Sequence, residues 1–367
     1  MAIGCSPSPA ESYSSAGEDL IPGKRELARI FSELPLGNEQ LNEVYDAVCS
    51  SSLNGYDEEY MMADLLTCPG AGVGDGHDLT KASAYSVPIR DMFSDYLSGK
   101  LATKAGSADV EAYLNALSKS DLQIYWPYSE DWSGDEYPVI TFDPGYGAES
   151  NYGYVVNVDS EGARVVDSLL VTEEVAKSRP VWVINNNDDS AFTPFDMYTK
   201  ASAAAETSTA KQKLMMKDFT MLRNYDSWFG GASEFFVKVG AVDGFNASSD
   251  SDLKLYTPSV TDFMIVVKRK NVGKKVPFEV VMLTDYTSQM EKIAFLVVED
   301  DGGTTTSWKC SATVKYQSKS YGFDIEIPYK DKDDIVWRGQ LDASFFMEEE
   351  EVTGRFGDVI ITFCREP

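Results

Sequence analysis

The chain has 367 residues, of which 32 are Lys or Arg and 59 are Asp or Glu, so its formal net charge is −27. This acidic balance excludes proteins that bind nucleic acid through a basic surface, and it disfavours docking on anionic lipid. No run of apolar residues approaches the roughly 20 that a membrane-spanning helix needs. At about 100–200 residues per domain, the length predicts two or three folded units.

The first residues, Met1-Ala2-Ile3-Gly4-Cys5, precede a stretch rich in Ser, Pro and Glu. A small residue directly before a cysteine resembles the end of a bacterial lipobox, in which the cysteine becomes the acylated first residue. The basic and most of the apolar part of such a signal are missing from this sequence. We expect residues 1–20 to be a disordered tether with lipid attached at Cys5. The alternative is a disordered cytosolic tail in which Gly-Cys occurs by chance.

Residues 21–120 have the apolar spacing of short helices. The first stripe recurs at i, i+3, i+4 and i+7 and is formed by Leu27, Ile30, Phe31 and Leu34. Pro35 ends this helix, Asn38 can cap a second and Asp57 a third that passes through Tyr60. Two more are expected around residues 89–97 and 110–117. The sequence therefore predicts a small region of five short helices.

From residue 121 onward the pattern changes to short β-type runs, five of which form a predicted β unit at 121–200. Residues 201–212 are small and polar, which predicts a linker. Residues 213–367 contain strands with period-two alternation, as in Phe323, Ile325 and Ile327. We expect an α+β chain: a helical region, a small β unit, and a C-terminal antiparallel β-sandwich of C2 or immunoglobulin-like architecture.

Charge changes at the same place as the composition. Residues 1–210 hold 12 basic and 34 acidic residues, a net charge of −22, whereas residues 211–367 have a net charge of −5. Each folded unit has its own surface, so this step supports a boundary near residues 201–210. A short exposed helix inside one domain is the alternative, because alanine favours helix.

Acidic loops suggest calcium in two places. Asn185, Asn187, Asp189 and Asp196 occupy EF-hand-like positions, although Pro194 interrupts the loop. The second set lies at predicted strand ends, where oxygen ligands could converge on one Ca²⁺, and consists of Glu299, Asp300, Asp301, Asp331, Asp333 and Asp334. Solvated acidic turns are the alternative for both sets. No other cofactor is indicated.

Aromatic residues cluster at Trp126, Tyr128 and Trp132 and again at Trp228. Exposed aromatic rings beside carboxylates bind sugars, so these four residues are candidate ligand contacts, although core packing is the alternative. The single histidine, His77, lies in a Gly-rich loop that lacks the spacing of a nucleotide-binding motif. It could be a general base or an ordinary loop residue, and no catalytic residue is assigned.

Five basic residues surround a predicted hairpin tip at Asn271, namely Lys268, Arg269, Lys270, Lys274 and Lys275. They could contact the acidic half of the chain, or they could blunt a sheet end and keep it soluble. Apart from Cys5, the pairs Cys49–Cys68 and Cys310–Cys364 could form disulfides in an oxidising envelope. Alternation places Cys364 off its strand's apolar face, which favours free thiols for at least one pair.

The runs LQIYWPYSEDW, PVWVINNND, NYDSWFGGASEFFVKVGAV and EDDGGTTTSWKCSA resemble uncharacterised cell-envelope lipoproteins of Bacteroidota. The resemblance covers most of the chain beyond residue 120 and implies an envelope-facing, anchored protein with a C-terminal β-sandwich. It supplies no catalytic residues.

We therefore expect a non-catalytic lipoprotein of the outer membrane or periplasm that binds a carbohydrate or an envelope protein, or has a structural role. It would contact membrane only through its lipid, and nothing in the sequence indicates an oligomer. The alternative is a secreted glycoside-type or other hydrolase that uses paired carboxylates with calcium support.

Overall fold

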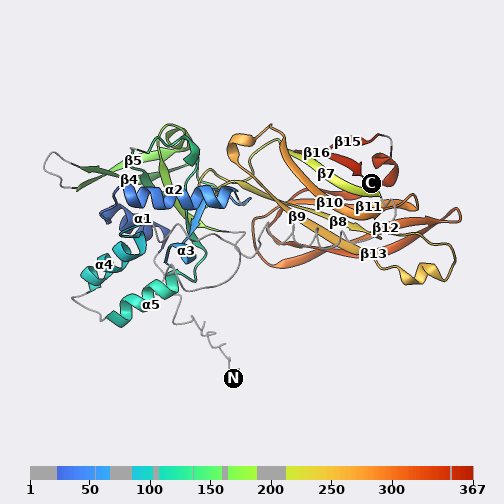
Figure 1. Cartoon of the computed structure of the whole chain (residues 1–367), viewed down its shortest axis with the longest axis horizontal. Helices are drawn as coiled ribbons and strands as arrows, with labels where there is room; N and C mark the ends of the chain where they lie inside the picture. Colours follow the sequence, from blue (N-terminus) through green and yellow to red (C-terminus); the bar gives the residue numbers. More distant parts are fainter. Residues whose placement is uncertain are drawn as a thin grey trace, which may run out of the picture.

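A computed structural model describes residues 23–53, 55–66, 85–101, 107–134, 136–158, 164–187, 212–347 and 349–366. The chain forms two lobes that lie next to each other along its long axis (Figure 1). We call residues 23–187 the N-terminal lobe and residues 212–366 the C-terminal lobe. Cys5, Cys68, His77, Asp189, Asp196 and the linker residues 201–211 lie outside the described ranges.

The described part of the N-terminal lobe contains six α-helices. They are α1 (Lys24–Glu33), α2 (Asn38–Leu53), α3 (Met62–Leu66), α4 (Ile89–Leu101), α5 (Ser107–Leu117) and α6 (Glu173–Ala176). The apolar stripe predicted for the first helix is confirmed, because Leu27, Phe31 and Leu34 are fully buried. The third predicted helix is wrong at its start. Glu59–Met61 forms a strand, and helix begins only at Met62.

The same lobe contains a six-stranded sheet in the order β1-β2-β6-β3-β4-β5. Its strands are β1 (Glu59–Met61), β2 (Leu122–Tyr125), β3 (Val139–Phe142), β4 (Ser150–Val158), β5 (Arg164–Thr172) and β6 (Val181–Asn186). Only β3 and β6 pair in parallel among these described strands. Helix residues such as Phe31 share one core with Trp182 and Ile184 of β6. The predicted change at residue 120/121 is thus a change of secondary structure inside one lobe.

The C-terminal lobe is built of strands: β7 (Gln212–Met221), β8 (Ser233–Ala241), β9 (Ser259–Val267), β10 (Val276–Tyr286), β11 (Met290–Glu299), β12 (Thr305–Tyr316), β13 (Lys319–Lys330), β14 (Asp334–Asp342), β15 (Glu351–Phe356) and β16 (Val359–Glu366). One sheet has the order β10-β7-β16-β15, and the other the order β13-β12-β11-β8-β9, with β14 pairing β11. Phe219 and Phe363 of the first sheet meet Phe235 and Phe295 of the second in one core. The chain is therefore a β-rich α+β protein.

The outer face of the second sheet is also covered. Ile325 and Ile327 of β13 pack with Val314 of β12 against Leu296 and Val298 of β11, which forms a second core. Every residue of β8 is buried as a result. The alternation predicted at Phe323, Ile325 and Ile327 is confirmed, and its apolar side faces this second core. Among the described residues, no helix is both long and apolar enough to cross a membrane.

Candidate functional site

The two lobes meet at a cationic turn between β9 and β10. Lys268 precedes the short 3-10 helix η5 (Arg269–Asn271), and its Nζ lies 3.1 Å from Oε1 of Glu58. Arg269 and Lys270 form ion pairs with Glu173 and Glu130, respectively. The alternative in which this basic tip contacts the acidic half of the chain is therefore confirmed for these three residues, since all three partners belong to the N-terminal lobe.

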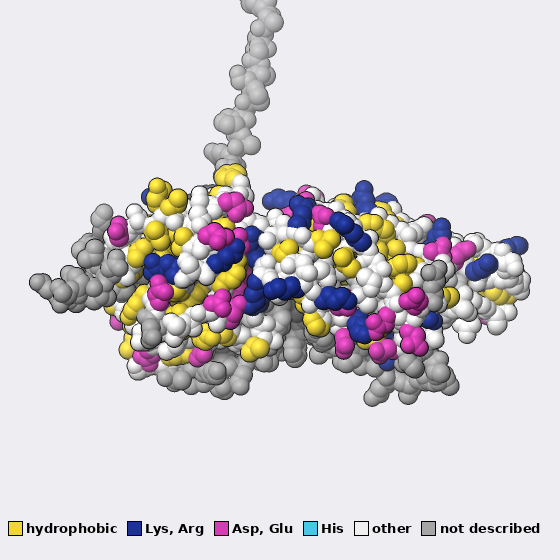
Figure 2. Space-filling model, turned by 90° about the horizontal axis from the view of Figure 1, so that it is seen from above, with side chains coloured by type: hydrophobic (Ala, Val, Ile, Leu, Met, Phe, Trp, Pro, Cys, Tyr) yellow, Lys and Arg dark blue, Asp and Glu magenta, His cyan; other side chains and the backbone are white. Residues whose placement is uncertain are grey.

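Lys275 of the predicted tip does not extend this contact. Lys275 pairs with Asp218 inside the C-terminal lobe at 3.1 Å, and its side chain is largely exposed. Lys and Arg side chains gather near the waist of the molecule on the face that Figure 2 shows. The opposite charges of the basic tip and the acidic N-terminal lobe thus attract each other at the junction.

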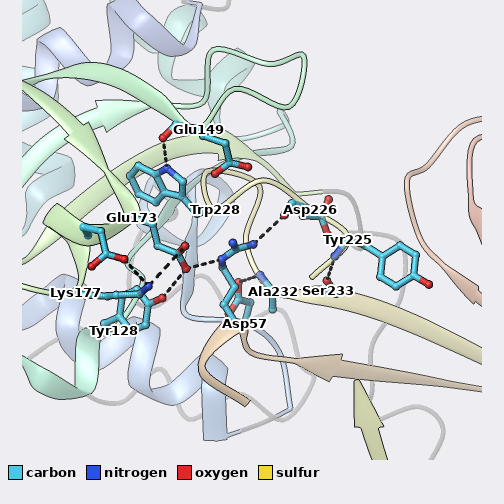
Figure 3. A network of polar contacts seen from close by, with 12 residues as sticks. Asp57, Tyr128, Glu149, Glu173, Lys177, Tyr225, Asp226, Trp228, Ala232 and Ser233 are labelled. Carbon is cyan, nitrogen blue, oxygen red and sulfur yellow. Dashed lines mark hydrogen bonds and ion pairs between the residues drawn. The ribbon is translucent and has the colours of Figure 1, made fainter. Parts of the chain in front are cut away.

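Arg269 is the most buried cation of the turn, with 8% of its side chain exposed. Its Nε donates to Oε1 of Glu173 at 3.0 Å, and its Nη1 donates to the backbone oxygen of Asp226 at 2.8 Å. Tyr128 donates its hydroxyl to the same Glu173 oxygen at 2.8 Å (Figure 3). Burial alone would raise the pKa of Glu173, but the hydrogen bonds from Arg269 and Tyr128 outweigh it and hold that pKa below its usual value.

In return, the loop between β7 and β8 inserts into the N-terminal lobe. Trp228 and Phe229 are 1% and 0% exposed, and they pack with Tyr125, Val139 and other residues on the sheet face opposite the helices. Trp228 Nε1 donates to the backbone oxygen of Glu149 at 3.0 Å. A ring this deeply buried cannot stack on a sugar, so the prediction of Trp228 as a ligand contact is wrong.

The same loop is also held by Asp57. Its Oδ2 accepts a hydrogen bond from the Ala232 amide at 2.8 Å, and both Asp57 and Glu58 are buried. Burial, with Asp57 as the next cause, raises the pKa of the Glu58 carboxyl. Gly231 has φ +132°, and a Cβ there would lie 2.9 Å from Asp57 Oδ2. The close approach of the two lobes therefore requires glycine at this position.

The remaining predicted aromatic contacts do not form a common platform. Trp126 is 1% exposed and packs edge-on against Trp182 and Trp132 in the helix-side core. Trp132 is half-buried and donates Nε1 to the backbone oxygen of Glu136 at 2.9 Å. Tyr128 is engaged with Glu173. Trp126 therefore belongs to the core, where its ring buries more apolar area than on the surface, and Tyr128 and Trp132 remain predicted ligand contacts.

One predicted metal ligand has partners that the sequence did not indicate. Single carboxylate oxygens of Glu299, Asp226 and Glu234 lie within 4.8 Å of one another and could hold a hard cation such as Ca²⁺. Burial, followed by the charge of Asp226, raises the pKa of Asp301 to about 6. Glu299 pairs with Asp334 across β11 and β14, so the predicted strand ends do come together.

Three other residues of that predicted set are engaged in local contacts. Asp300 accepts two hydrogen bonds from Lys330 Nζ at 2.7 and 2.8 Å. Asp331 accepts the Thr304 amide, and Asp333 accepts the Lys330 amide. Burial raises the pKa of Asp333 to about 6. These residues therefore share one end of the lobe, and the group of three carboxylates found there among the described residues includes only Glu299 of the predicted set.

Two residues of the EF-hand-like prediction lie within the described ranges. Asn185 donates Nδ2 to the backbone oxygens of Phe229 and Gly230, and thus holds the inserted loop. Asn187 donates Nδ2 to Glu59 and Gln123, both at 2.8 Å. Both amides donate through Nδ2, which leaves their Oδ1 atoms, the oxygens that would bind calcium, without a hydrogen-bond partner. Asp189 and Asp196 lie outside the described residues.

The cysteines within the described ranges are free thiols. Cys310 on β12 and Cys364 on β16 are free thiols, so the disulfide considered between them is not formed. Burial raises the pKa of Cys310 to about 11. Cys49 is free, whereas its considered partner Cys68 lies outside the described ranges, as do Cys5 and His77.

The sequence analysis did not predict a contact between lobes for several junction residues, among them Asp57, Glu58, Glu130, Glu173 and Phe229. The run NYDSWFGG gave a signal, because aromatic residues beside two glycines in an otherwise polar loop suggest a buried contact. The acids gave none, since nothing distinguishes them from the many other carboxylates of the chain.

No protein-family model, curated protein or solved structure matches the chain, so its own contacts are the basis for assigning a role.

Proposed function

We propose that the protein is a non-catalytic lipoprotein of the cell envelope, anchored through Cys5, whose two lobes act as one rigid body in a binding or structural role. The observation that carries the rigid-body part is the reciprocal junction. The C-terminal lobe sends Lys268, Arg269 and Lys270 to acids of the N-terminal lobe, and it buries Trp228 and Phe229 in that lobe.

These contacts engage three polar side chains of the junction with one another. Arg269 and Glu173 neutralise each other, and Tyr128 is committed to the same carboxylate. A buried charge that loses its partner is strongly destabilising, so such pairs favour a single arrangement of the lobes. A fixed spacing between two surfaces suits a protein that displays or positions a partner, for which we propose an envelope protein or a carbohydrate.

For the C-terminal lobe we propose kinship with C2 or immunoglobulin-like sandwiches. Two antiparallel sheets that enclose one core support this assignment. The hairpin β12–β13, which covers the outer face of β8 and β11, departs from a two-layer sandwich. A solved relative with the same strand order but without this hairpin would support the assignment.

A secreted hydrolase with paired carboxylates is the alternative, and one feature favours it. A hollow of about 280 Å³ in the C-terminal lobe is lined by several acids, namely Glu279, Glu350, Glu351 and Glu366. Lys217 forms an ion pair with Glu351 in this hollow. A larger hollow of about 560 Å³ in the N-terminal lobe has only Asp121 as a carboxylate in its lining.

The anchoring is tested by expressing the gene with its upstream codons in a bacterial host and determining the mass of the purified protein. We expect a mature chain that begins at Cys5 and carries acyl groups, and a Cys5→Ser variant that carries none. An unmodified cysteine would refute the lipoprotein assignment. Hydrolysis of glycosides that is lost in Glu351→Gln but kept in Asp121→Asn would favour the hydrolase.

A further inference from the structure

An uncharged strip runs along the hairpin of β4 and β5. Tyr152 pairs with Leu170, Tyr154 with Ser168, and Val156 with Val166, so these alternate positions share one face of the sheet. Tyr152, Leu170 and Val166 are 65%, 48% and 43% exposed. None of these six positions carries a charge, and Tyr154 among them is half-buried against the helix-side core. Hydrophobic side chains also gather on this lobe in Figure 2.

A second exposed tyrosine lies at the end of the sheet where this strip begins. Tyr146 is fully exposed in the turn that joins β3 to β4, and it has φ 59° between Gly145 and Gly147, which also have positive φ. Such a conformation costs a bulky residue about 1–2 kcal/mol. Asp143 shapes the turn by accepting the Gly145 amide at 2.8 Å. The turn therefore holds an aromatic ring out in solvent at a conformational cost.

The beginning of the described chain lies against the same turn. Lys24 Nζ is 2.7 Å from Oδ2 of Asp143, so α1 starts beside it. The roughly 18 residues between Cys5 and Gly23 span at most about 60 Å when fully extended. A lipid at Cys5 would therefore keep this end of the N-terminal lobe within a short reach of the bilayer, at a high effective concentration.

We propose that Tyr146 and the β4–β5 strip rest on the lipid–water interface of the bilayer that carries the anchor. This inference rests on the proposed anchoring at Cys5. Tyrosine suits that interface, because its ring is apolar while its hydroxyl remains hydrated. The absence of charge on the strip fits a zwitterionic surface, whereas the acidic body would be repelled by an anionic one. The contact sets the orientation of both lobes, because the junction holds them together.

Radical footprinting with mass spectrometry tests the contact without any acyl chain. The full Cys5→Ser chain with an N-terminal hexahistidine is bound to phosphatidylcholine vesicles that contain nickel-chelating lipid, and it is compared with the same chain free in solution. We expect oxidation of Tyr146 and Tyr152 to fall at least threefold on the vesicles. Leu255, which is 79% exposed in the C-terminal lobe, should be oxidised equally in both states. Equal oxidation of Tyr146 and Tyr152 in both states would overturn the proposal.

A double variant, Tyr146→Ser with Tyr152→Ser, tests whether these rings make the contact. Both side chains are exposed, so the fold should persist, and the protection of Leu170 on vesicles should disappear. Leu255→Ser is the matched control and should keep that protection. Protection of Leu170 that survives the double variant would also overturn the proposal. Because the anchor here is synthetic, failure of acylation at Cys5 and failure of the interfacial contact are distinguished.

Discussion

Arg269 of the C-terminal lobe donates Nε to Glu173 of the N-terminal lobe at 3.0 Å. The same guanidinium holds the backbone oxygen of Asp226, so one side chain connects the other lobe to the loop that is inserted into it. The ion pair and the insertion of Trp228 are thus parts of one junction. The arrangement explains why a planar group with several donors occupies this position.

Removal of this side chain should weaken the coupling of the lobes. Arg269→Ala leaves Glu173 partly buried without its cation, and we expect a loss of about 3–5 kcal/mol in the free energy of unfolding. The unfolding free energy of Arg269→Lys should lie between those of Arg269→Ala and the wild type, because an ammonium is a compact point charge that cannot reproduce the planar guanidinium. Urea unfolding followed by tryptophan fluorescence measures both. Lys275→Ala, at an exposed pair, should cost less than about 1 kcal/mol.

Truncation of the inserted Trp228 should lower the free energy of unfolding by a similar amount. Trp228→Ala removes a buried ring from the sheet of the N-terminal lobe and leaves a cavity, which costs about 3–5 kcal/mol. Leu255→Ala, at an exposed position, is the control and should change the unfolding free energy by less than about 0.5 kcal/mol. A Trp228→Ala variant as stable as the wild type would show that the inserted ring contributes nothing to the stability of the protein.

Stability should depend on pH through Glu43. This buried carboxylate accepts the Ile89 amide at the start of α4, and its burial raises its pKa to about 7. Because the folded state holds the proton more tightly than the unfolded state, the contribution is present below pH 4.5 and is lost as pH rises through 7. The loss should be about 3 kcal/mol. Unfolding free energies at pH 5 and 8 measure it.

Glu43→Gln should reduce this pH dependence, because the amide oxygen can still accept the Ile89 hydrogen bond while carrying no charge. Asp301 and Asp333 contribute with the same sign, since burial raises the pKa of each to about 6. Glu111→Gln, at an exposed position of α5, should leave the profile of the wild type unchanged. A Glu43→Gln profile as steep as that of the wild type would contradict the assignment.

The calcium hypothesis predicts a rise in the melting temperature when millimolar Ca²⁺ replaces EDTA. Binding at 100 times the Kd would add about 2.7 kcal/mol to the stability of the folded state. Asp226→Asn removes a charged ligand from the group with Glu234 and Glu299 and should abolish the shift. Asp262→Asn is a control outside that group. An unchanged melting temperature in the wild type would exclude calcium at this place.

Much of the fold followed from the sequence because local patterns determined it. The stripe from Leu27 to Leu34 and the alternation at Phe323, Ile325 and Ile327 each mark one buried face, and both are confirmed. The strand at Glu59–Met61 was missed because it pairs with residues more than 60 positions away. A three-residue strand has no periodicity of its own.

The candidate site was harder to predict for the same reason. Trp228 gave a visible signal, but sequence alone cannot separate a ring buried between lobes from one exposed to a ligand. The charge step indicated that the halves differ, and the basic tip indicated where they could meet. The identity of Glu173 as the partner of Arg269 depends on tertiary geometry, because α6 is only a short helix between two strands.

The central claim is that the two lobes form one cooperative body. Differential scanning calorimetry of the full wild-type chain, compared with the Arg269→Ala and Trp228→Ala double variant, tests it most directly. We predict one transition for the wild type and two separated transitions for the double variant, because the junction then no longer links the lobes. Two independent transitions in the wild type, at temperatures that the double variant leaves unchanged, would contradict the claim.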